Sequence, residues 1–419
     1  MNGDATEAAD TPTFSDTIEL RGHIIDSLLL PQIMEEVMDR GGEFVIQQID
    51  VGRRKDEPSY ARIRISAPTR ELLDLLLDRA QRIGATPQDA EPVQTAPAPI
   101  DGVFPEGFYS TTNLPTEIRL AGRWIAVDYP EMDCAIAVDP GAGRAWTVAL
   151  SDVRAGQQLV VGHEGIKVLP LERPRTQPPV FAFMGSNVSS EKPKALLIRE
   201  IAERMRAIRA RHGRVILVGG PVLVHTGSRD MVARLIREGY VNVLFAGNGL
   251  AAHDIEMAMF GTSLGVSLAE GTPREGGHEH HLRAINRVRR AGSIARAVEG
   301  GLLADGIMHA CVTAGASYIL AGSIRDDGPL PDVVTDTLKA QSLMRAEVRQ
   351  GVDLVMVLSS MLHGIATGNF LAASVTTVCV DINPAVVTKL ADRGSFQAIG
   401  LVMDVEGFLR ELCADLGLD

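Results

Sequence analysis

The sequence has few aromatic residues and few cysteines, and it lacks any long hydrophobic run. Only 4% of its 419 residues are Phe, Trp or Tyr, and the four cysteines are widely separated, without a C-x-x-C pair. This spacing argues against a zinc or disulfide framework and favours reduced thiols. There is no signal peptide and no apolar stretch long enough for a membrane span, so we expect a cytoplasmic protein that does not bind membranes.

The chain also lacks an excess of positive charge. Its 41 Lys and Arg stand against 53 Asp and Glu, which gives a net charge of −12. Such an acidic chain disfavours nucleic-acid binding as its main role. Glycine is abundant, with 41 residues, and 45% of the chain is hydrophobic, as is typical of α/β proteins with many tight turns. The length predicts two or three domains.

The order of local patterns predicts a tail and three domains. Residues 1–13 are small and polar, which predicts a disordered tail. Residues 14–95 alternate strand and helix signals, which predicts a βαββα module, and the Pro- and Ala-rich segment 86–102 is expected to be a linker. Short strands between Gly and Pro turns predict a small β-rich subdomain over 96–180. Repeated βα units over 181–419 predict a mainly parallel, Rossmann-like sheet covered by helices.

The strands of the last domain are expected at seven continuous apolar runs. These runs are VILVGG, VNVLFAG, LGVSL, SYILAGS, LVMVLSS, TTVCVDI and QAIGLVMD. Strands of this kind are buried on both faces, as in a parallel sheet.

The segment DLVMVLSSMLHGIATGN, followed by TTVCVDINP, is the most informative part of the chain. An apolar run ends at small polar residues, a Gly-bearing stretch follows, and a second apolar run ends on Asp381, 21 residues after Ser360. A dinucleotide fold places the carboxylate that binds a ribose diol about 20 residues beyond its first turn. No G-x-G-x-x-G is present here, so the segment predicts a nucleotide site of a variant kind.

Three further loops follow predicted strands and carry glycine with polar side chains. In a parallel sheet such loops meet at one edge, where glycines let a backbone approach a phosphate closely. Each loop alone is also compatible with glycine used only for turn geometry. The loops contain Gly219, Gly220 and His225; Gly247, Asn248, Gly249 and His253; and Gly322, Ser323, Arg325, Asp326 and Asp327.

Several side chains are candidates for acid–base chemistry. His363 follows a strand end inside the proposed nucleotide loop, and Lys194 and Lys339 are rare lysines in a chain that prefers arginine. Each has a purely structural or solvent-exposed alternative. Cys311 is interpreted as a small buried residue rather than a nucleophile.

The cluster GGHEHHLRAIN contains three histidines and a glutamate in sequence. Metal ligands on one helix need a spacing of three or four residues, and adjacent histidines point apart, so no metal site is predicted. The cluster is interpreted instead as substrate-carboxylate contacts, hydrogen bonding or helix capping.

Long segments of the chain resemble the archaeal-type ornithine cyclodeaminase family. The resemblance is carried by FPEGFYSTTNLPTEIR, LFAGNGLAAHDIE, GGHEHHLRAIN, LAGSIRDDGPLPDV, SSMLHGIATGN, VCVDINPAVVTKLADRGS and MDVEGFL. It implies an NAD-binding domain similar to the deoxyhypusine synthase fold, which would account for the missing glycine fingerprint. Residues 14–95 are similar to the domain shared with lysine-oxoglutarate reductase/saccharopine dehydrogenase (LOR/SDH). A homo-oligomer is expected from the same likeness.

The resemblance implies both a cofactor site and a reaction. The implied NAD contacts are Asn248, Gly249, Asp326, Ser360, Met361, Leu362, His363, Asp381, Ile382, Asp404 and Val405. Alanine is expected in relatives in place of Gly249, a departure that a backbone contact would survive. The implied reaction converts L-ornithine to L-proline and ammonia, with NAD reduced and regenerated within one turnover.

Catalytic roles do not follow from the resemblance and are hypotheses. Asp326 and Asp327 are candidates near the cofactor, His363 or Lys339 is the candidate for proton transfer, and Arg325 is a candidate for binding the substrate carboxylate. Two other functions remain open at this point: an NAD-dependent amino-acid dehydrogenase with net redox turnover, and a noncatalytic NAD-sensing regulator.

Overall fold

The computed structural model describes residues 14–25, 27–54, 57–87, 91–169, 194–264, 266–267, 277–326, 328–391 and 398–418. The chain divides into two compact units, Met1–Ala182 and Phe183–Asp419. The tail predicted to be disordered, 1–13, lies outside the described residues. Among the helices that the structure describes, none is both long and apolar enough to cross a membrane.

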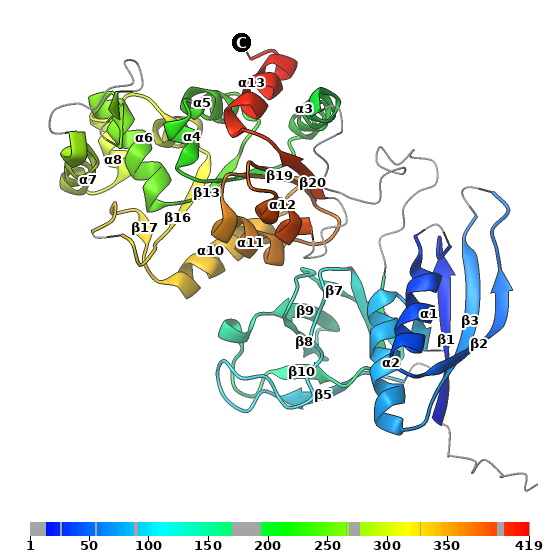
Figure 1. Ribbon diagram of the computed structural model, residues 1–419. Helices are drawn as coiled ribbons and strands as arrows, with labels where there is room; N and C mark the ends of the chain where they lie inside the picture. Colours follow the sequence, from blue (N-terminus) through cyan, green and yellow to red (C-terminus); the bar gives the residue numbers. More distant parts are fainter. Residues whose placement is uncertain are drawn as a thin grey trace, which may run out of the picture. The chain divides into compact units, whose positions relative to one another are not determined.

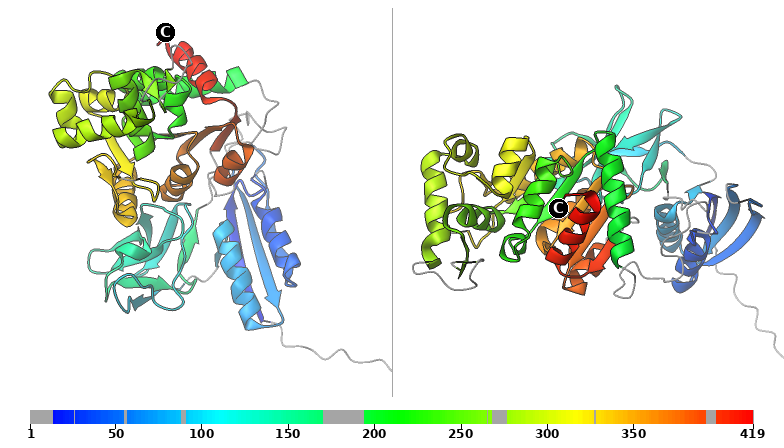
Figure 2. Two further views of the ribbon diagram at one scale, coloured as in Figure 1. Left: turned by 60° about the vertical axis from the view of Figure 1, so that its left-hand side comes forward. Right: turned by 90° about the horizontal axis from the view of Figure 1, so that it is seen from above.

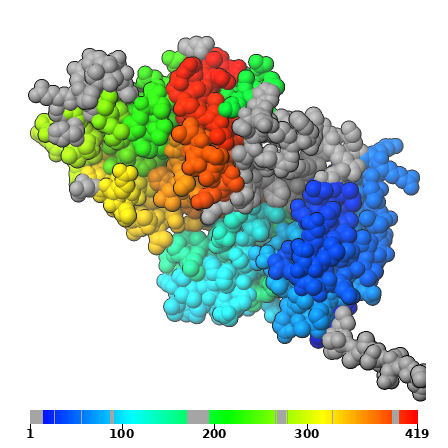
Figure 3. Space-filling model, in the orientation of Figure 1, coloured from blue at the N-terminus to red at the C-terminus, as the bar shows by residue number. Residues whose placement is uncertain are grey.

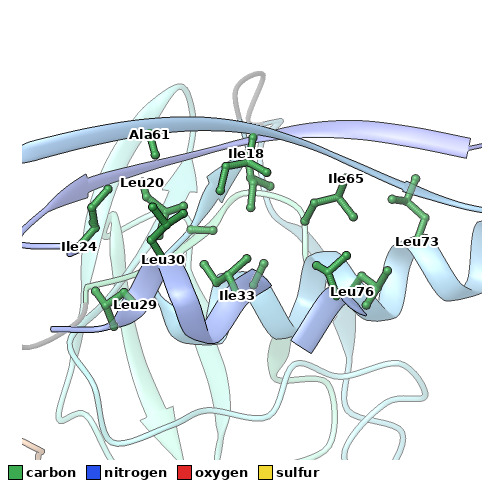
Figure 4. Packing of buried hydrophobic residues seen from close by; sticks show 14 of the residues in the cluster. Ile18, Leu20, Ile24, Leu29, Leu30, Ile33, Ala61, Ile65, Leu73 and Leu76 are labelled. Carbon is green, nitrogen blue, oxygen red and sulfur yellow. The ribbon is translucent and has the colours of Figure 1, made fainter. Parts of the chain in front are cut away.

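The first unit begins with the predicted βαββα module. Its elements are β1 (Phe14–Gly22), α1 (Leu29–Asp39), β2 (Glu43–Asp50), β3 (Ser59–Ala67) and α2 (Arg70–Ile83), followed by the short β4 (Thr86–Pro87). The strands form an antiparallel sheet in the order β2-β3-β1-β4. Because side chains alternate along a strand, one face of β1 and β3 presents residues such as Ile18 and Ile65 to Ile33 and Leu76 of the two helices (Figure 4).

The β-rich subdomain belongs to the same unit and forms one seven-stranded sheet in the order β11-β6-β7-β9-β8-β10-β5. Its elements are β5 (Gln94–Pro97), β6 (Thr116–Leu120), β7 (Arg123–Asp128), β8 (Ala135–Asp139), β9 (Arg144–Val148), the 3-10 turn η1 (Leu150–Asp152), β10 (Gln158–Val161) and β11 (Ile166–Val168). The prediction of a linker over 86–102 is wrong in part. This segment contains β4 and β5, and β5 pairs with β10. Strand β5 has no large apolar side chain, so only its backbone pairing defines it.

The second unit is built on a parallel sheet, as predicted. Its strands are β12 (Val215–Gly219), β13 (Val243–Gly247), β16 (Ser317–Ala321), β17 (Val333–Val334), β18 (Leu354–Leu358), β19 (Thr376–Asp381) and β20 (Ala398–Val402). They lie in the order β17-β16-β13-β12-β18-β19-β20, and every pairing is parallel. Apart from β17, this is the doubly wound order of dinucleotide-binding domains. The predicted Rossmann-like α/β fold is confirmed.

One strand of the predicted sheet is wrong. The run LGVSL was expected to join the parallel sheet, but β14 (Thr262–Ser263) and β15 (Val266–Ser267) form a separate two-stranded antiparallel sheet. The run alternates its few apolar residues with small ones, so it cannot supply a strand that is buried on both faces.

Helices cover both faces of the parallel sheet (Figures 1 and 2). Helices α10 (Thr337–Arg349), α11 (Met361–Phe370) and α12 (Pro384–Ala391) pack on one face, where Met344, Phe370 and Val387 join the core of the strands. The other face carries α3 (Lys194–Ala210), α4 (Val222–His225), α5 (Arg229–Arg237), α6 (Asn248–Phe260), α9 (Ile307–Ala314) and α13 (Val405–Leu416). Right-handed crossovers produce this division, because the chain winds in opposite directions from the centre of the sheet.

The remaining elements complete the second unit. The 3-10 turn η2 (Gly277–Glu279), α7 (His280–Ala291) and α8 (Ile294–Glu299) lie beyond α6 and α9. The C-terminal helix α13 packs beside α3, and the two form adjoining surface in the space-filling view, in red and green (Figure 3). The carboxyl ends of the parallel strands therefore share one edge, with helices on both sides.

Candidate active site

The proposed nucleotide loop lies at the point where the winding of the sheet reverses. Strands β12 and β18 are neighbours there, and Gly220 N–H donates to the Leu358 carbonyl at 3.1 Å. A Cβ on Gly220 would lie 2.0 Å from the Ser359 carbonyl oxygen, so only glycine permits this approach. Ser359 itself has a φ of 47°. Dinucleotides bind in the crevice at such a switch point.

The sheet order corrects one step of the sequence argument. The unit from Leu354 to Asp381 was interpreted by the spacing rule for the first turn of a dinucleotide fold. In the structure β18 is the fourth strand in winding order and begins the second half of the domain. The two halves of a doubly wound sheet have the same local βαβ pattern, so spacing alone did not distinguish them.

Helix α11 begins at this crevice with its N-terminus open. Ser360 is the N-cap residue, its side chain makes no capping hydrogen bond, and no acidic residue occupies the first turn. The side chains of Met361 and Leu362 are 46% and 77% exposed. Unpaired N–H groups and the positive end of the helix dipole favour a phosphate at such a terminus.

Asp381 ends β19, next to the start of α11. Its Oδ1 accepts a hydrogen bond from the Asn383 N–H at 2.8 Å, which fixes the carboxylate at the strand end. The following side chain, Ile382, is 72% exposed. A carboxylate in this position has the chemistry needed to accept hydrogen bonds from a ribose diol.

Asp404 and Val405 follow β20 at the same edge, but their side chains have structural roles. Asp404 is the N-cap of α13, and its Oδ2 accepts a hydrogen bond from the Gly407 N–H at 3.0 Å. The Val405 side chain is buried in the core. A contact between Val405 and a ligand would therefore use its backbone.

Asn248, Gly249 and Asp326 lie at the ends of β13 and β16. The Asn248 amide donates towards Asp326 Oδ1 at 3.4 Å, and its oxygen accepts from the Leu330 N–H at 3.1 Å. Asp326 also accepts from the Ser323 N–H at 2.8 Å. These bonds hold the loop after β16 against the start of α6. A Cβ on Gly249 would meet only Pro221, at 3.9 Å, so alanine fits there.

His363 reaches across the strand ends from the first turn of α11. Its Cε1 would lie 3.1 Å from a Cβ on Gly247, so the imidazole packs over the end of β13. Burial lowers the pKa of His363, and the Asp326 charge opposes this shift. A neutral imidazole in the crevice can accept a proton.

The other catalytic candidates have no described contact with the strand-end residues Asn248, Asp326 and His363. Lys339 lies exposed in the first turn of α10, after β17, and Arg325 is exposed in the loop after β16. Asp327 lies outside the described residues. Lys194, at the start of α3, donates from Nζ to the Val402 carbonyl at 3.0 Å, a structural contact at the end of β20. Cys311 is fully buried, and burial raises its pKa to about 12, as expected for an unreactive thiol.

A partly buried network of histidines, hydroxyls and one glutamate lies between α4, α6 and α7. His253 Nδ1 is 2.9 Å from Glu256 Oε2, and Thr262 donates to Glu256 Oε1 at 2.9 Å. Thr262 Oγ1 is also 2.8 Å from His280 Nδ1. His225 Nδ1 is 2.6 Å from the Ser263 hydroxyl. We call this set of six residues the histidine network.

The histidine network gives the GGHEHH cluster its structural setting. His280 stacks on Phe260, with ring centroids 4.7 Å apart, as well as bonding to Thr262. The side chain of His278 lies outside the described residues. Within the described part of the chain, no three His, Cys, Asp or Glu side chains are placed to hold a metal ion. Hydrogen bonding, one of the interpretations made from the sequence, is the role observed for His280.

Three family models match consecutive parts of this chain. The LOR/SDH bifunctional enzyme conserved region matches residues 15–114, the first region of the ArgZ-like arginine dihydrolase C-terminal part matches 115–198, and its Rossmann fold matches 199–412. The ornithine cyclodeaminase of Methanothermobacter thermautotrophicus is 53% identical over 392 residues, which cover 94% of this chain and 95% of that protein. The chain belongs to the archaeal-type ornithine cyclodeaminase family.

Solved structures of bifunctional relatives have the same fold. The apo structure of the cyanobacterial arginine dihydrolase ArgZ is 38% identical with a TM-score of 0.84, over 99% of this chain and 60% of that one. The ternary complex of AgrE with ornithine and NAD+ is 42% identical with a TM-score of 0.53, over 97% of this chain and 58% of that one. The chain thus corresponds to somewhat more than half of each bifunctional protein. The family membership predicted from the sequence motifs is confirmed.

Proposed function

We propose that this chain is an NAD-dependent ornithine cyclodeaminase, which converts L-ornithine to L-proline and ammonia. The observation that carries the proposal is the switch point of the sheet, just beyond the carboxyl ends of β12 and β18. A glycine contact, an open helix N-terminus and a strand-end carboxylate meet there, in a chain that is 53% identical to an archaeal ornithine cyclodeaminase. The AgrE complex, which contains both ornithine and NAD+, supports the same pair of ligands.

The residues at the crevice suit NAD. The backbone N–H groups of Ser360, Met361 and Leu362 receive a phosphate, and the Asp381 carboxylate accepts hydrogen bonds from a ribose. The exposed side chains of Leu362 and Ile382 supply apolar surface for a ring of the cofactor. NAD, once bound, accepts the hydride from the α-carbon of ornithine and returns it to the cyclic imine.

The remaining predicted contacts complete the proposed cofactor site. Asn248 and Gly249 act from the end of β13, with Asp326 bonded to the Asn248 side chain. Asp404 and Val405 contribute through the start of α13, where the Asp404 side chain is engaged in capping and the Val405 side chain is buried.

Side chains beside the cofactor carry the first chemical step. The α-amine of ornithine must be neutral before its carbon can lose a hydride, and we assign removal of this proton to His363, which burial keeps neutral. Asp326 and Asp327 attract the cationic substrate, and Arg325 binds its carboxylate. Lys339 is the alternative proton acceptor, although its exposed position in α10 favours His363.

One incubation tests the proposed function. Purified protein is mixed with L-ornithine and a small amount of NAD+, and proline, ammonia and NADH are measured together. Equal amounts of proline and ammonia, well above the NAD+ added and without net NADH, are expected. NADH formed in step with ornithine consumption would indicate a dehydrogenase instead. Binding of NAD with no turnover of ornithine would indicate a regulator.

We further propose a cytoplasmic location and a homo-oligomer. The location is supported by the thiols of Cys134, Cys311, Cys379 and Cys413, which are all buried and form no disulfide. The oligomer is supported by β2, an edge strand whose Val45, Ile46 and Ile49 side chains are 50%, 37% and 44% exposed. Edge strands of this kind can pair with a second copy. Light scattering of the purified protein measures the oligomeric state.

A further inference from the structure

Two histidines of the histidine network each have one ring nitrogen fixed by an internal partner. His253 Nδ1 lies 2.9 Å from the carboxylate of Glu256, whose side chain is completely buried. His225 Nδ1 lies 2.6 Å from the Ser263 hydroxyl. The two imidazoles meet edge to face with centroids 4.8 Å apart. Fixing Nδ1 leaves Nε2 of each ring as the atom available to another group.

The network lies at the same edge of the sheet as the cofactor crevice. His225 ends α4, which begins directly after Gly220 and Pro221. His253 is one helical turn beyond Gly249 in α6, so the two residues share a face of the helix. A Cβ on Gly249 would lie 3.9 Å from Pro221, and this face of α6 therefore faces α4. Helix rise puts His253 roughly 7.5 Å along α6 from Asn248. Side chains on a helix lean towards its N-terminus, which here is the carboxyl edge of the sheet.

The environment favours a His253 ring that can accept a proton at Nε2. The Glu256 carboxylate accepts the hydrogen of Nδ1, which leaves the lone pair on Nε2. The His253 side chain is 15% exposed, so the network is open on this side. Beside it, burial and then the neighbouring His253 lower the pKa of His225. A buried carboxylate that orients an imidazole is the arrangement used for acid–base catalysis.

The proposed reaction has a second proton step, which comes after the one assigned to His363. After hydride removal, the δ-ammonium of ornithine must lose a proton before its nitrogen can attack the α-carbon. The former α-amine must then gain a proton to leave as ammonia. His363 belongs to α11, on the opposite face of the sheet from α6, and its ring lies over Gly247 at the end of β13. It is assigned to the α-amine before hydride transfer.

We propose that His253, oriented by Glu256, is the acid–base group of the cyclisation step. Its Nε2 takes the proton from the δ-ammonium as the new C–N bond forms at the α-carbon. It then returns that proton to the α-nitrogen. The ring nitrogen releases its second proton to water, and its lone pair expels ammonia as the old C–N bond breaks. The imidazole begins and ends neutral, and no electrons are exchanged in this step. Glu256 is a positioning residue, and the inference rests on the proposed function.

The test uses variants that remove Nε2 while keeping as much of the network as possible. In His253→Asn the amide nitrogen takes the place of Nδ1 and still donates to Glu256, but no base remains at the Nε2 position. His253→Gln is the second variant, with an amide nearer the Nε2 position. His212→Asn is the matched control, because His212 is exposed at the end of α3 with a φ of 57°, which asparagine tolerates. Circular dichroism and NAD titration check that each variant is folded and binds the cofactor.

The decisive readout separates hydride removal from ring closure. Rapid mixing of the His253→Asn protein and NAD+ with L-ornithine is expected to give a burst of NADH at the wild-type rate. Steady proline formation is expected to fall roughly 10²- to 10⁴-fold, the usual contribution of a general acid–base group. The control should form proline like the wild type, without accumulating NADH.

Other outcomes separate this inference from the proposed function. Proline formation near the wild-type rate in both His253 variants would overturn it, as would equal slowing of the NADH burst and of proline formation. Failure of both variants to fold would also overturn it by showing a structural role. If the wild-type protein forms no proline from ornithine, the proposed function itself has failed.

Discussion

Replacing Gly220 by alanine tests whether the crevice depends on the close approach of β12 and β18. The added Cβ would lie 2.0 Å from the Ser359 carbonyl oxygen, whereas real Cβ contacts are essentially never shorter than 3.0 Å. The two backbones must therefore separate by about 1 Å, and neither atom belongs to a side chain that can rotate away. The Ser359 N–H also donates to the Val380 carbonyl at 3.1 Å, which restrains Ser359. The displacement of the backbone therefore extends to the start of α11.

The expected cost is that of overpacking, about 1–3 kcal/mol. If NAD can bind only when the N-terminus of α11 is in its wild-type position, this free energy opposes binding, and the Kd for NAD rises roughly 5- to 150-fold. Isothermal titration calorimetry measures the Kd, and urea denaturation measures the accompanying loss of folding free energy. Gly407→Ala is the control in the same unit, because a Cβ there meets nothing closer than 4.0 Å. It should leave the Kd unchanged.

A Gly220→Ala protein that binds NAD as tightly as the wild type would contradict this expectation. That result would mean either that the strands separate without cost or that the cofactor does not contact the start of α11. A crystal structure of the variant decides between these two explanations, because it shows the distance between the Cβ added at this position and the Ser359 carbonyl oxygen.

Three further changes test separate parts of the account. Asp381→Ala removes the proposed ribose acceptor. Because a hydrogen bond to a charged group contributes about 1.5–3 kcal/mol, the Kd for NAD measured by calorimetry should rise roughly 10- to 150-fold. An unchanged Kd would exclude the ribose role of Asp381. Asp326→Asn removes the charge that raises the pKa of His363. The acid limb of the profile of kcat/KM against pH should therefore move to lower pH. A shift of this limb to higher pH would contradict the role of His363 as the base. Asp254→Ala leaves Arg229 without the buried carboxylate that lies 2.7 Å from its Nε. This change should lower the free energy of unfolding, measured by urea denaturation, by about 3–5 kcal/mol. A smaller loss, typical of an exposed ion pair, would show that Arg229 finds another partner.

The sequence predicted the strands and the edge of the sheet at which the candidate site residues lie. Strands β12, β13, β16, β18, β19 and β20 are continuous apolar runs, and runs of this kind identify a sheet buried on both faces. Since the carboxyl ends of parallel strands share one edge, residues as distant in the chain as Asn248, Ser360 and Asp381 could be assigned to one site before any pairing was known.

Other features depend on long-range pairing that no local pattern reveals. Strand β18 is fourth in winding order, yet its βαβ unit has the spacing of a first one. Strand β5 is defined by its pairing with β10, and its sequence, QTAP, has no large apolar residue. Glu256 has the sequence of an exposed helix charge and is instead buried, because Thr262 and the backbone of Leu264 fold back over it. A helical spacing of three between His253 and Glu256 was the only local signal of the histidine network.

Transfer of deuterium from L-[2-²H]ornithine to proline tests the central claim most directly. If the hydride leaves the α-carbon and returns to the same carbon of the cyclic imine within one turnover, proline should carry deuterium at C2. Its deuterium content should equal that of the ornithine, even in the presence of excess unlabelled NADH. Proline that has lost its deuterium to solvent or to the free NADH pool would contradict a recycled hydride and the cyclodeaminase account.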